Sequence, residues 1–437
     1  MIPEQIRMAK RISIGKDNIL IRLLFILFFC SNVFSSVVAR TIGNQYIYIS
    51  YNIVFFSLLI LFVFSHGNLS NYIAPFLIYL FVALLFVVTA IVHPEYGEWF
   101  NHQTYGIRAA FLNPRCGIWA FIIAWLYKDK INLFSTLKIV CWIEMCFLGL
   151  QFYAAMRRGY WIDFDVNTGE MMEQEYNMEF GYTMLFSTSF MGAYAFIKKK
   201  KAYYIPFAAG FALILLGGSR GAAIWPVMLF PLMLPFKWKN MNQKQRFIFA
   251  FLVILAMMLL VLIYKNFRAV LVIISSILSK IGIAIPSRTI ESLLSGTFSD
   301  GNGREEIYSM AIDLIKTGGP FGWGVYGDRY VIGRIYKWGY SHNIILELFV
   351  SFGYIGGTIA CLGLLYGHIK LYRVCNSPIE QIIYITFLAT SMKLMLSNSF
   401  WYTPSFWYLL AIMMMWKRTT NSRGLIITRG LLQNGVD

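Results

Sequence analysis

The amino-acid sequence predicts an all-α polytopic membrane protein, and two observations lead to this fold class. Of the 437 residues, 58% are hydrophobic and 14% are charged, whereas an ordinary soluble domain carries about 25% charged residues. The apolar residues also come in long unbroken blocks, as expected of helices that cross a bilayer. A secreted disulfide scaffold, a disordered chain and a DNA-binding protein are therefore disfavoured.

Twelve apolar blocks are predicted as membrane spans, because a span needs roughly 20 mostly apolar residues. The first block is retained as a span, since no small-residue cleavage site follows it. An even number of spans puts both ends of the chain on the same side of the membrane. The predicted spans are 19–39, 46–64, 72–92, 109–127, 133–154, 180–197, 202–217, 222–236, 247–264, 343–366, 380–397 and 401–416.

The distribution of Lys and Arg predicts the orientation. Alternate connections, beginning with 1–18, together hold 20 of these residues, while the short connections of the other set hold 5. The positive-inside rule therefore places the first set and both termini in the cytoplasm. Because the basic residues lie between apolar blocks, the net charge of +17 needs no nucleic-acid partner to explain it.

The longest connection then lies at the periplasmic face. Its first part, Arg268 to Ile285, has apolar residues at helical spacing and ends before Pro286, which predicts a helix lying on the outer membrane surface. A second helix is predicted from Arg304 to Lys316. The chain is thus divided into a cytoplasmic N-terminus (1–18), transmembrane helices 1–9 (19–264), a periplasmic loop domain (265–341), transmembrane helices 10–12 (342–416) and a cytoplasmic tail (417–437).

The segment Gly217–Gly221 joins two unusually short spans and is the first candidate for chemistry. Each flanking span has only about 15 residues, or roughly 23 Å of helix against a core of roughly 30 Å, so the tip should stop short of the outer surface. An unpaired Arg220 at that depth costs roughly 2.5–3.5 kcal/mol, which a bound anion would offset. The glycines beside Ser219 would let backbone N–H groups approach the same anion. The alternative is an Arg that snorkels from a helix end.

A second candidate lies in the long loop. Gly301–Asn302–Gly303 precedes Arg304, which would begin a helix whose N-terminus favours anions, and its guanidinium could grip a phosphate. After this helix comes Gly319–Gly324, with the sequence Gly-Pro-Phe-Gly-Trp-Gly. The alternative is an exposed Arg304 paired with Glu305 or Asp300.

The third candidate is Ser341–His342–Asn343, directly before a predicted span that contains Glu347. His342 is the only one of five histidines at the outer mouth of a span next to the large loop. The alternative is a histidine satisfied at the membrane interface. Lys393, near the outer end of its own span, could face the same recess.

Other polar residues are interpreted as structural. Asp163 and Asp165 have the spacing of a metal-binding pair, but a solvated acidic loop is the preferred interpretation. Within the membrane, Arg115 and Glu144 are predicted to pair. The six scattered cysteines are interpreted as small apolar fillers.

Taken together, the Ser-Arg-Gly hairpin, the Gly-Arg helix with Gly-Pro-Phe-Gly-Trp-Gly, and Ser-His-Asn-x-x-Leu-Glu resemble one family. It is the O-antigen polymerase (Wzy-type) and O-antigen ligase superfamily, and the resemblance covers residues 219–357 in detail. It implies a GT-C-like fold and an inverting, metal-independent glycosyltransferase without a cofactor. Its partners would be an undecaprenyl-pyrophosphate-linked donor and acceptor, the bilayer of the bacterial inner membrane and a chain-length regulator.

The resemblance also implies the site residues. Catalytic roles fall to His342, Arg220 and Arg304: the two arginines would neutralise the pyrophosphate leaving group and His342 would take the acceptor proton. Substrate-binding roles fall to Arg220, Arg304, Ser219, Asn343, Glu347 and Lys393.

Polymerase is the favoured activity, because Ser-His-Asn-Ile-Ile-Leu-Glu followed by Phe-Gly-Tyr-Ile-Gly-Gly is more similar to polymerases. A ligase, which transfers the glycan to lipid A core, is the first alternative. A lipid-linked sugar flippase or transporter is the second alternative. It is less favoured, because the sequence shows no internal repeat and the candidate site residues are predicted to gather at the outer face instead of along a central path.

Overall fold

The computed structural model describes the chain in segments. These are 19–66, 70–103, 105–164, 171–174, 177–217, 219–238, 303–336 and 339–417, with scattered residues between 241 and 280. The predicted helix from Arg268 to Ile285, most of the predicted span 247–264 and the two terminal segments lie outside the described residues.

Helices dominate the described residues, as predicted. The first half of the chain forms the helix Ile19–Phe29, then α2 (Ser31–Thr41), α3 (Ile47–His66), α4 (Ser70–Val92), α5 (Gly97–Phe100), α6 (Ile107–Leu112), α7 (Gly117–Leu126) and α8 (Lys130–Arg158). Short 3₁₀ helices, η1 (Asn44–Tyr46) and η2 (Pro94–Tyr96), lie in the connections.

The second half begins with a small hairpin, in which β1 (Trp161–Phe164) pairs antiparallel with β2 (Met171–Gln174). The helices that follow are α9 (Met178–Lys198), α10 (Tyr204–Leu216), α11 (Arg220–Trp238), α15 (Arg304–Gly318), α16 (Gly327–Ile332), α17 (Ile344–Val374), α18 (Pro378–Ser391) and α19 (Pro404–Met415), with η3 (Lys201–Tyr203) and η5 (Met392–Met395) between them. The predicted helix from Arg304 is therefore confirmed.

The chain is a polytopic membrane protein. Five described helices are long and apolar enough to cross a membrane, or up to six if the pair Ile19–Phe29 and α2 counts as one span. That pair is bent by 79° at Cys30, where the backbone leaves the helical region (φ −99°, ψ 30°). Shorter apolar helices occupy the ranges predicted for spans at α10, α11 and α19. The prediction of helices at these ranges is thus confirmed, while the count of twelve spans stays a prediction.

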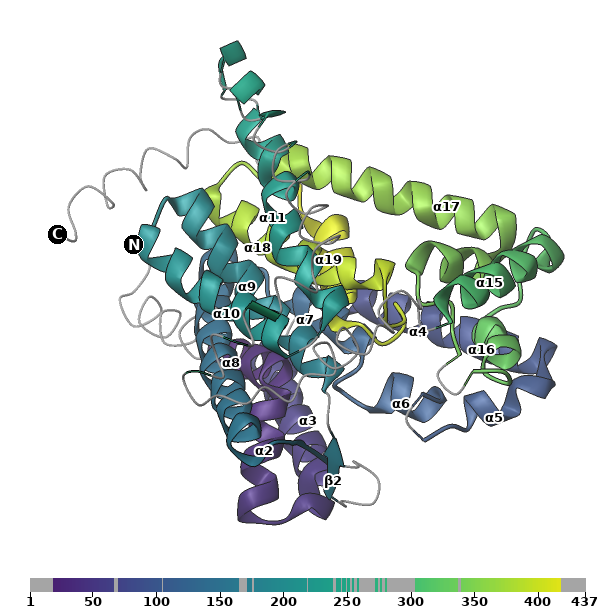
Figure 1. The fold of residues 1–437 in the computed structure, drawn as a ribbon. Coiled ribbons are helices and arrows are strands. Elements are labelled where there is room, and N and C mark those ends of the chain that lie inside the picture. The colour runs from purple at the N-terminus through teal and green to yellow at the C-terminus, as the bar shows by residue number, and fades with distance from the viewer. Residues whose placement is uncertain are drawn as a thin grey trace, which may run out of the picture.

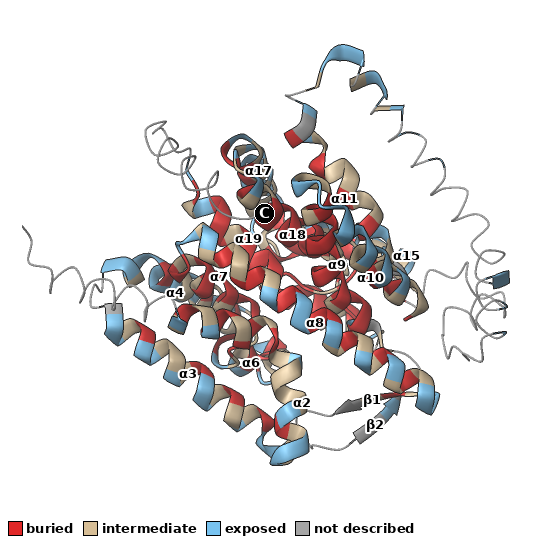
Figure 2. Cartoon of the chain, turned by 90° about the vertical axis from the view of Figure 1, so that its left-hand side faces the viewer, coloured by how far each residue is buried: buried red, intermediate tan, exposed pale blue. Residues whose placement is uncertain are grey.

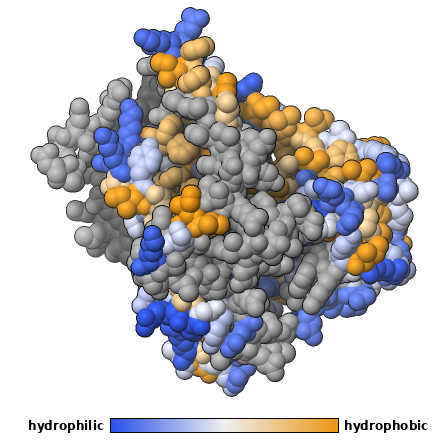
Figure 3. All heavy atoms as spheres, viewed as in Figure 1, coloured by the Kyte–Doolittle hydropathy of each residue, from blue (hydrophilic) through white to orange (hydrophobic). Residues whose placement is uncertain are grey.

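Buried residues concentrate in α7, α9, α18 and α19, whereas α3 and α4 carry many exposed residues (Figure 2). α9 packs against α8, α10, α11 and α18, while α19 packs mainly on α7. In Figure 1, α17 runs along the upper right, and α15, which packs against α16 and α17, lies at the right. The outer side of α17 carries a strip of exposed apolar side chains, also seen in Figure 3, that suits contact with lipid: Ile355, Ile359, Leu362, Leu365, Tyr366 and Ile369.

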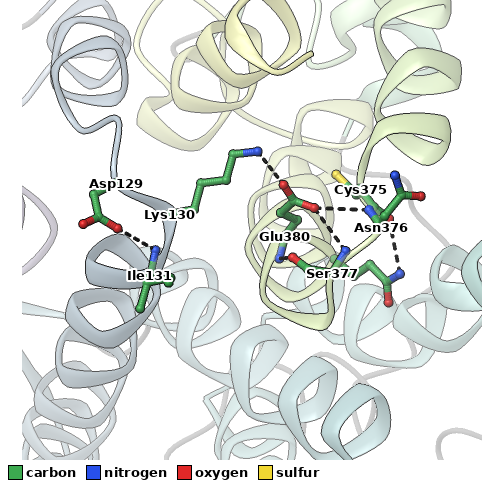
Figure 4. Close-up of polar contacts among 8 residues, drawn as sticks. Asp129, Lys130, Ile131, Cys375, Asn376, Ser377 and Glu380 are labelled. Atoms are coloured by element: carbon green, nitrogen blue, oxygen red, sulfur yellow. Dashed lines mark hydrogen bonds and ion pairs between the residues drawn. The ribbon is translucent and has the colours of Figure 1, made fainter. Parts of the chain in front are cut away.

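Connections predicted as cytoplasmic meet through satisfied polar contacts. Lys130, at the start of α8, pairs with Glu380 in the first turn of α18 (Figure 4). Glu380 also closes a capping box with Ser377: its carboxylate accepts from the Ser377 N–H at 3.1 Å, and the Ser377 hydroxyl accepts from the Glu380 N–H at 3.2 Å. The Lys130 ammonium lies 4.4 Å from the centre of the Trp416 ring. This contact, called the Lys130–Glu380 clamp below, fixes α8 to α18.

The predicted pair of Arg115 and Glu144 is wrong. The Arg115 guanidinium lies 4.4 Å from the centre of the Tyr51 ring, and no ion pair joins it to Glu144. Arg115 sits in the break between α6 and α7, where Pro114 interrupts the helix, so its side chain points to a different neighbour than a continuous helix would give it.

Candidate functional site

Two connections predicted to lie at the periplasmic face converge in the structure with the start of the predicted span 401–416. Tyr326, before α16, and Tyr402, before α19, both donate hydrogen bonds to the backbone carbonyl of Tyr105, before α6. The Tyr326 and Tyr402 hydroxyls are themselves 2.5 Å apart. Thr89, near the end of α4, accepts from the Val325 N–H at 3.2 Å. Residues from widely separated parts of the sequence therefore form one compact unit at this face.

The segment Gly319–Gly324 forms the base of this unit. The Trp323 N–H donates to the Val350 carbonyl at 2.8 Å, and the Tyr354 N–H donates to the Gly319 carbonyl at 3.1 Å. The segment therefore forms backbone hydrogen bonds with α17 both before and after Gly353. At Gly353 the backbone of α17 is not helical (φ 66°, ψ −167°). A Cβ on Gly353 would lie 2.4 Å from the Gly322 nitrogen, which explains why glycine is needed at both positions. The Gly-Pro-Phe-Gly-Trp-Gly motif is thus a structural brace for a break in α17.

A turn directly before α17 carries the predicted catalytic histidine. We call Tyr340–Asn343 the His342 turn. Asp328, in the first turn of α16, accepts from both the N–H (2.9 Å) and the hydroxyl (2.8 Å) of Ser341 through one carboxylate oxygen. Asp328 and Ser341 are both buried. A buried carboxylate with two such bonds fixes the turn firmly.

His342 itself has a strained backbone and a partly exposed side chain. Its φ is +49°, and its ring lies 3.7 Å, centre to centre, from the ring of Tyr340. Two other non-glycine residues of this unit, Tyr326 (φ +69°) and Asn398 (φ +67°), also have positive φ. Asn398 donates its N–H to the Tyr340 hydroxyl at 2.8 Å. Strain of this kind persists where surrounding contacts enforce it, and it gathers at functional sites.

Asn343 and Glu347, predicted to bind substrate, use their polar groups inside the protein. The Asn343 side chain caps α17 by accepting from the Ile345 N–H at 2.9 Å, and its amide donates to the Met395 carbonyl of η5 at 3.1 Å. Glu347 is 1% exposed and accepts from the Ser399 hydroxyl and from the Phe400 N–H. These contacts join the start of α17 to η5 and to the residues before α19.

The Ser219–Arg220–Gly221 hairpin reaches the same unit through η5, which contacts both α11 and α17. Ser219 is buried and lies so close to Gly181 that a Cβ on Gly181 would collide with it. In the same way, a Cβ on Gly221 would collide with the Tyr182 hydroxyl. The Lys393 ammonium, on η5, lies 5.6 Å from the centre of the Tyr182 ring. Arg220 is the first residue of α11, and its side chain lies outside the described residues. The structure therefore brings Ser219, Lys393 and Asn343 into one chain of contacts.

Arg304 begins α15, directly after Gly303 with its positive φ of 74°. The buried face of this helix packs on α16 and α17, with Ile307, Leu314, Ile332 and Val350 in one apolar cluster. Among the described residues, the partly exposed Arg304 side chain forms no ion pair, and Glu305 does not neutralise it. Asp300, the other partner considered, lies outside the described residues. Within the described residues, the Arg304 guanidinium is thus available to bind an anion.

Sequence reasoning missed Asp328 and Arg329. Both are buried, at 2% and 5% exposure, although adjacent opposite charges in a polar loop are typical of a solvated turn. The Arg329 guanidinium is surrounded by four aromatic rings, which we call the tyrosine cage: Tyr105, Tyr326, Tyr340 and Tyr402, at 5.3–5.8 Å from ring centre to guanidinium carbon. Tyrosines in three separate segments of the sequence were the available signal for this cage, but only the fold shows that they meet.

The cage hydroxyls described here are neutral at physiological pH. Burial raises the pKa of Tyr326 to about 12, although the hydrogen bond with Tyr402 opposes the shift. Burial also raises the pKa of Tyr340, although its bonds to Ser397 and Asn398 lower it. The two rings therefore surround Arg329 without adding negative charge.

A metal centre is not assembled by the described residues, where no group of three or more His, Cys, Asp or Glu side chains gathers. Asp163 lies in β1, and Asp165 lies outside the described residues.

Comparison with known protein families identifies the region just described. Residues 205–361 match the family model described as O-antigen ligase. The chain carries an O-antigen ligase family domain. Proteins of this family are glycan-transferring membrane enzymes of the ligase or polymerase type, which act in surface polysaccharide biosynthesis in the bacterial inner membrane. No curated protein and no solved structure matches the chain.

The O-antigen ligase family domain contains most of the site. It runs from α10 into α17 and includes Ser219, Arg220, Arg304 and the His342 turn. Tyr105, Lys393 and Tyr402 lie outside the matched range, so the helices that flank the family domain complete the site.

Proposed function

We propose that the protein is an O-antigen polymerase, an inverting, metal-independent glycosyltransferase that joins undecaprenyl-pyrophosphate-linked repeat units at the periplasmic face of the inner membrane. The observation that carries this proposal is the His342 turn. It is strained, braced by the buried Asp328, and linked through Asn343 and η5 to the Ser219–Arg220–Gly221 hairpin.

The proposed reaction is a single displacement. His342 accepts the proton of an acceptor hydroxyl while the oxygen attacks the anomeric carbon of the donor glycan. The bond from that carbon to the pyrophosphate oxygen breaks, and undecaprenyl pyrophosphate leaves with the electron pair. Arg220 and Arg304 stabilise the negative charge that builds on the leaving group. Attack from the face opposite the leaving group inverts the anomeric centre.

The proposed topology has twelve spans, with both termini in the cytoplasm and the loop 265–341 between helices 9 and 10 in the periplasm. It is supported by the way the connections meet. Those assigned to the cytoplasm include the ones joined by the Lys130–Glu380 clamp, while those assigned to the periplasm meet around Tyr105 and Tyr326. A GT-C-like arrangement would place the His342 turn and the two arginines at one membrane face.

Ligase activity is the second candidate, because the matching family model is described as O-antigen ligase. A polymerase and a ligase share the donor chemistry and differ in the acceptor, which is another lipid-linked repeat for the polymerase and lipid A core for the ligase. A strain lacking the protein separates the two. Lipopolysaccharide with a single repeat unit on the core supports the polymerase, and core without any repeat unit supports the ligase.

The catalytic assignment is tested by complementing the deletion strain with His342→Ala, Arg220→Ala and Arg304→Ala. Each variant should insert into the membrane at the normal level and produce no long polymer, since loss of a general base alone costs about 10²- to 10⁴-fold. His93→Ala and Arg334→Ala are matched controls from the same face and should restore the normal polymer. Normal polymer length in the three site variants would refute the assignment.

The same variants can be tested outside the cell. Purified protein in detergent should lengthen lipid-linked repeats, and His342→Ala should not. A protein that only moves lipid-linked sugars across the membrane would fail to lengthen them in the unaltered form as well.

A further inference from the structure

We infer that Arg329 is a third anion-binding residue of the site, whose guanidinium takes an oxyanion of the lipid-linked glycan beside His342. This inference rests on the proposed function, since it names a further contact to the same substrate. The oxyanion is either a phosphate oxygen of the pyrophosphate or a carboxylate of an acidic sugar, because a guanidinium binds both in the same way.

The first argument is the burial of an unsatisfied charge. Arg329 is 5% exposed, and its buried Nη1 atom has no hydrogen-bond partner among the described residues. A guanidinium stays protonated in proteins, so the charge cannot be removed by deprotonation. Leaving one nitrogen of a buried cation unbonded is unfavourable, because the lost hydrogen bonds to water are not replaced. Such an arrangement is expected where a ligand supplies the missing acceptor.

The second argument is that the nearby carboxylates are already occupied. One oxygen of Asp328 accepts from the Arg329 backbone N–H at 2.8 Å, and the other accepts from Ser341. Glu347 accepts from Ser399 and Phe400. Within the part of the chain that the structure describes, no ion pair involves the Arg329 side chain. The two acidic neighbours therefore balance the charge without using its donors.

The third argument is the geometry of the tyrosine cage. The rings of Tyr326 and Tyr340 lie 5.3 and 5.4 Å from the guanidinium carbon and contribute cation–π attraction. This attraction holds the cation in place but uses none of the N–H donors. The donors keep their capacity for a fork of hydrogen bonds to one oxyanion.

The fourth argument is proximity to the histidine. The Tyr340 ring contacts the Arg329 guanidinium and also lies 3.7 Å, centre to centre, from the His342 ring. Asp328, the neighbour of Arg329, accepts a hydrogen bond from Ser341, the neighbour of His342. An anion held by Arg329 would therefore lie next to the proposed base. The cage and the His342 turn form a single recognition unit.

The test measures binding rather than turnover. The probe is undecaprenyl pyrophosphate without a sugar, added to the full-length protein in detergent and followed by intrinsic tryptophan fluorescence. Arg329→Met has a similar volume, and replacing a buried charge by an apolar side chain is often tolerated by the fold. Arg334→Met is the matched control, because Arg334 is exposed and stacks on Tyr330 at 3.9 Å outside the cage.

Arg329→Met should bind the probe about 10- to 100-fold more weakly, the loss expected for one charge-assisted hydrogen-bond pair, while Arg334→Met binds normally. Arg329→Lys should recover part of the affinity, since it restores the charge without the fork. If Arg329→Met does not fold, Arg329→Lys alone tests the inference. A 3-fold or greater loss of affinity for the probe supports the inference, and unchanged affinity overturns it.

A second arm uses the oligosaccharide released from the lipid-linked repeat. Weaker binding of the lipid pyrophosphate identifies a phosphate oxygen as the ligand, and weaker binding of the free oligosaccharide alone identifies a sugar carboxylate. Normal binding of both by Arg329→Met overturns the inference and leaves the proposed function intact. Failure of the unaltered protein to bind either probe would instead contradict the proposed function.

Discussion

The Lys130–Glu380 clamp and the His342 turn are two polar clusters that treat their charges in opposite ways. In the clamp, both oxygens of Glu380 have donors and the helix start is closed by a capping box with Ser377. In the unit around the His342 turn, Arg329 has an unbonded nitrogen and three non-glycine residues have positive φ. One cluster is fully satisfied, and the other retains strain and unused donors.

This difference separates a structural role from a functional one. A satisfied ion pair at a helix start stabilises the position of two helices and has nothing left to offer a ligand. A strained turn with free donors is less stable by itself, and it persists because surrounding contacts such as Asp328 with Ser341 hold it. Changes in the clamp are therefore expected to affect stability, whereas loss of the Asp328 brace on the His342 turn is expected to affect activity.

The largest effect is expected at the brace beneath the site. Gly353→Ala places a Cβ 2.4 Å from the Gly322 nitrogen at a backbone conformation that only glycine adopts easily. The cost should be about 3–5 kcal/mol from strain and overpacking together, measured by thermal unfolding in detergent. Gly363→Ala is the control on the same helix, because nothing lies within 4 Å of its Cβ position. Equal stability of the two variants would show that the break in α17 is not enforced.

A large loss of activity is expected from Asp328→Asn. An amide has a single acceptor oxygen, so it cannot accept from both Ser341 donors on one side and from the Arg329 N–H on the other, and the brace on the His342 turn is weakened. Polymerisation should fall about 10- to 100-fold through kcat, with KM for the lipid-linked repeat nearly unchanged. Asp313→Asn, which alters an exposed pair with Lys316 on α15, should have normal kinetics. A variant with a changed KM and a normal kcat would assign Asp328 to substrate binding instead.

A smaller effect is expected in the clamp. Lys130→Met removes the partner of the buried Glu380 and should lower the free energy of unfolding by about 1–3 kcal/mol. Activity per folded molecule should be unchanged, which a polymerisation assay on purified protein checks. Lys128→Met is the control, since Lys128 bonds Asn71 at the exposed surface. Loss of activity without loss of stability in Lys130→Met would show that the clamp takes part in function.

The smallest effect is expected from Tyr340→Phe. It removes the hydroxyl that accepts from the Asn398 N–H at 2.8 Å but keeps the ring against His342 and Arg329. The free energy of unfolding should fall by about 1 kcal/mol, with the polymer retained. Tyr366→Phe on the exposed side of α17 should leave the unfolding temperature unchanged. If Tyr340→Phe abolishes polymer, the hydroxyl takes part in the reaction.

Much of the helix pattern and part of the site could be predicted. Hydropathy predicted the ranges of α3, α4, α8 and α17 to within a few residues at most of their ends, because lipid-facing helices need long apolar blocks. The motif at His342 was found because it stands at the mouth of a span. The pair of Arg115 and Glu144 was wrong, since a break at Pro114 turns Arg115 toward Tyr51, and hydropathy does not report side-chain direction.

The sequence by itself determined that this is a membrane protein with basic residues gathered in alternate connections, because apolar length and charge are local properties of the chain. Only the tertiary structure decided that Tyr105, Tyr326, Tyr340 and Tyr402 surround Arg329 and that Asp328 holds Ser341. Such contacts join residues up to about three hundred positions apart. Their existence depends on how the helices pack, which local composition does not specify.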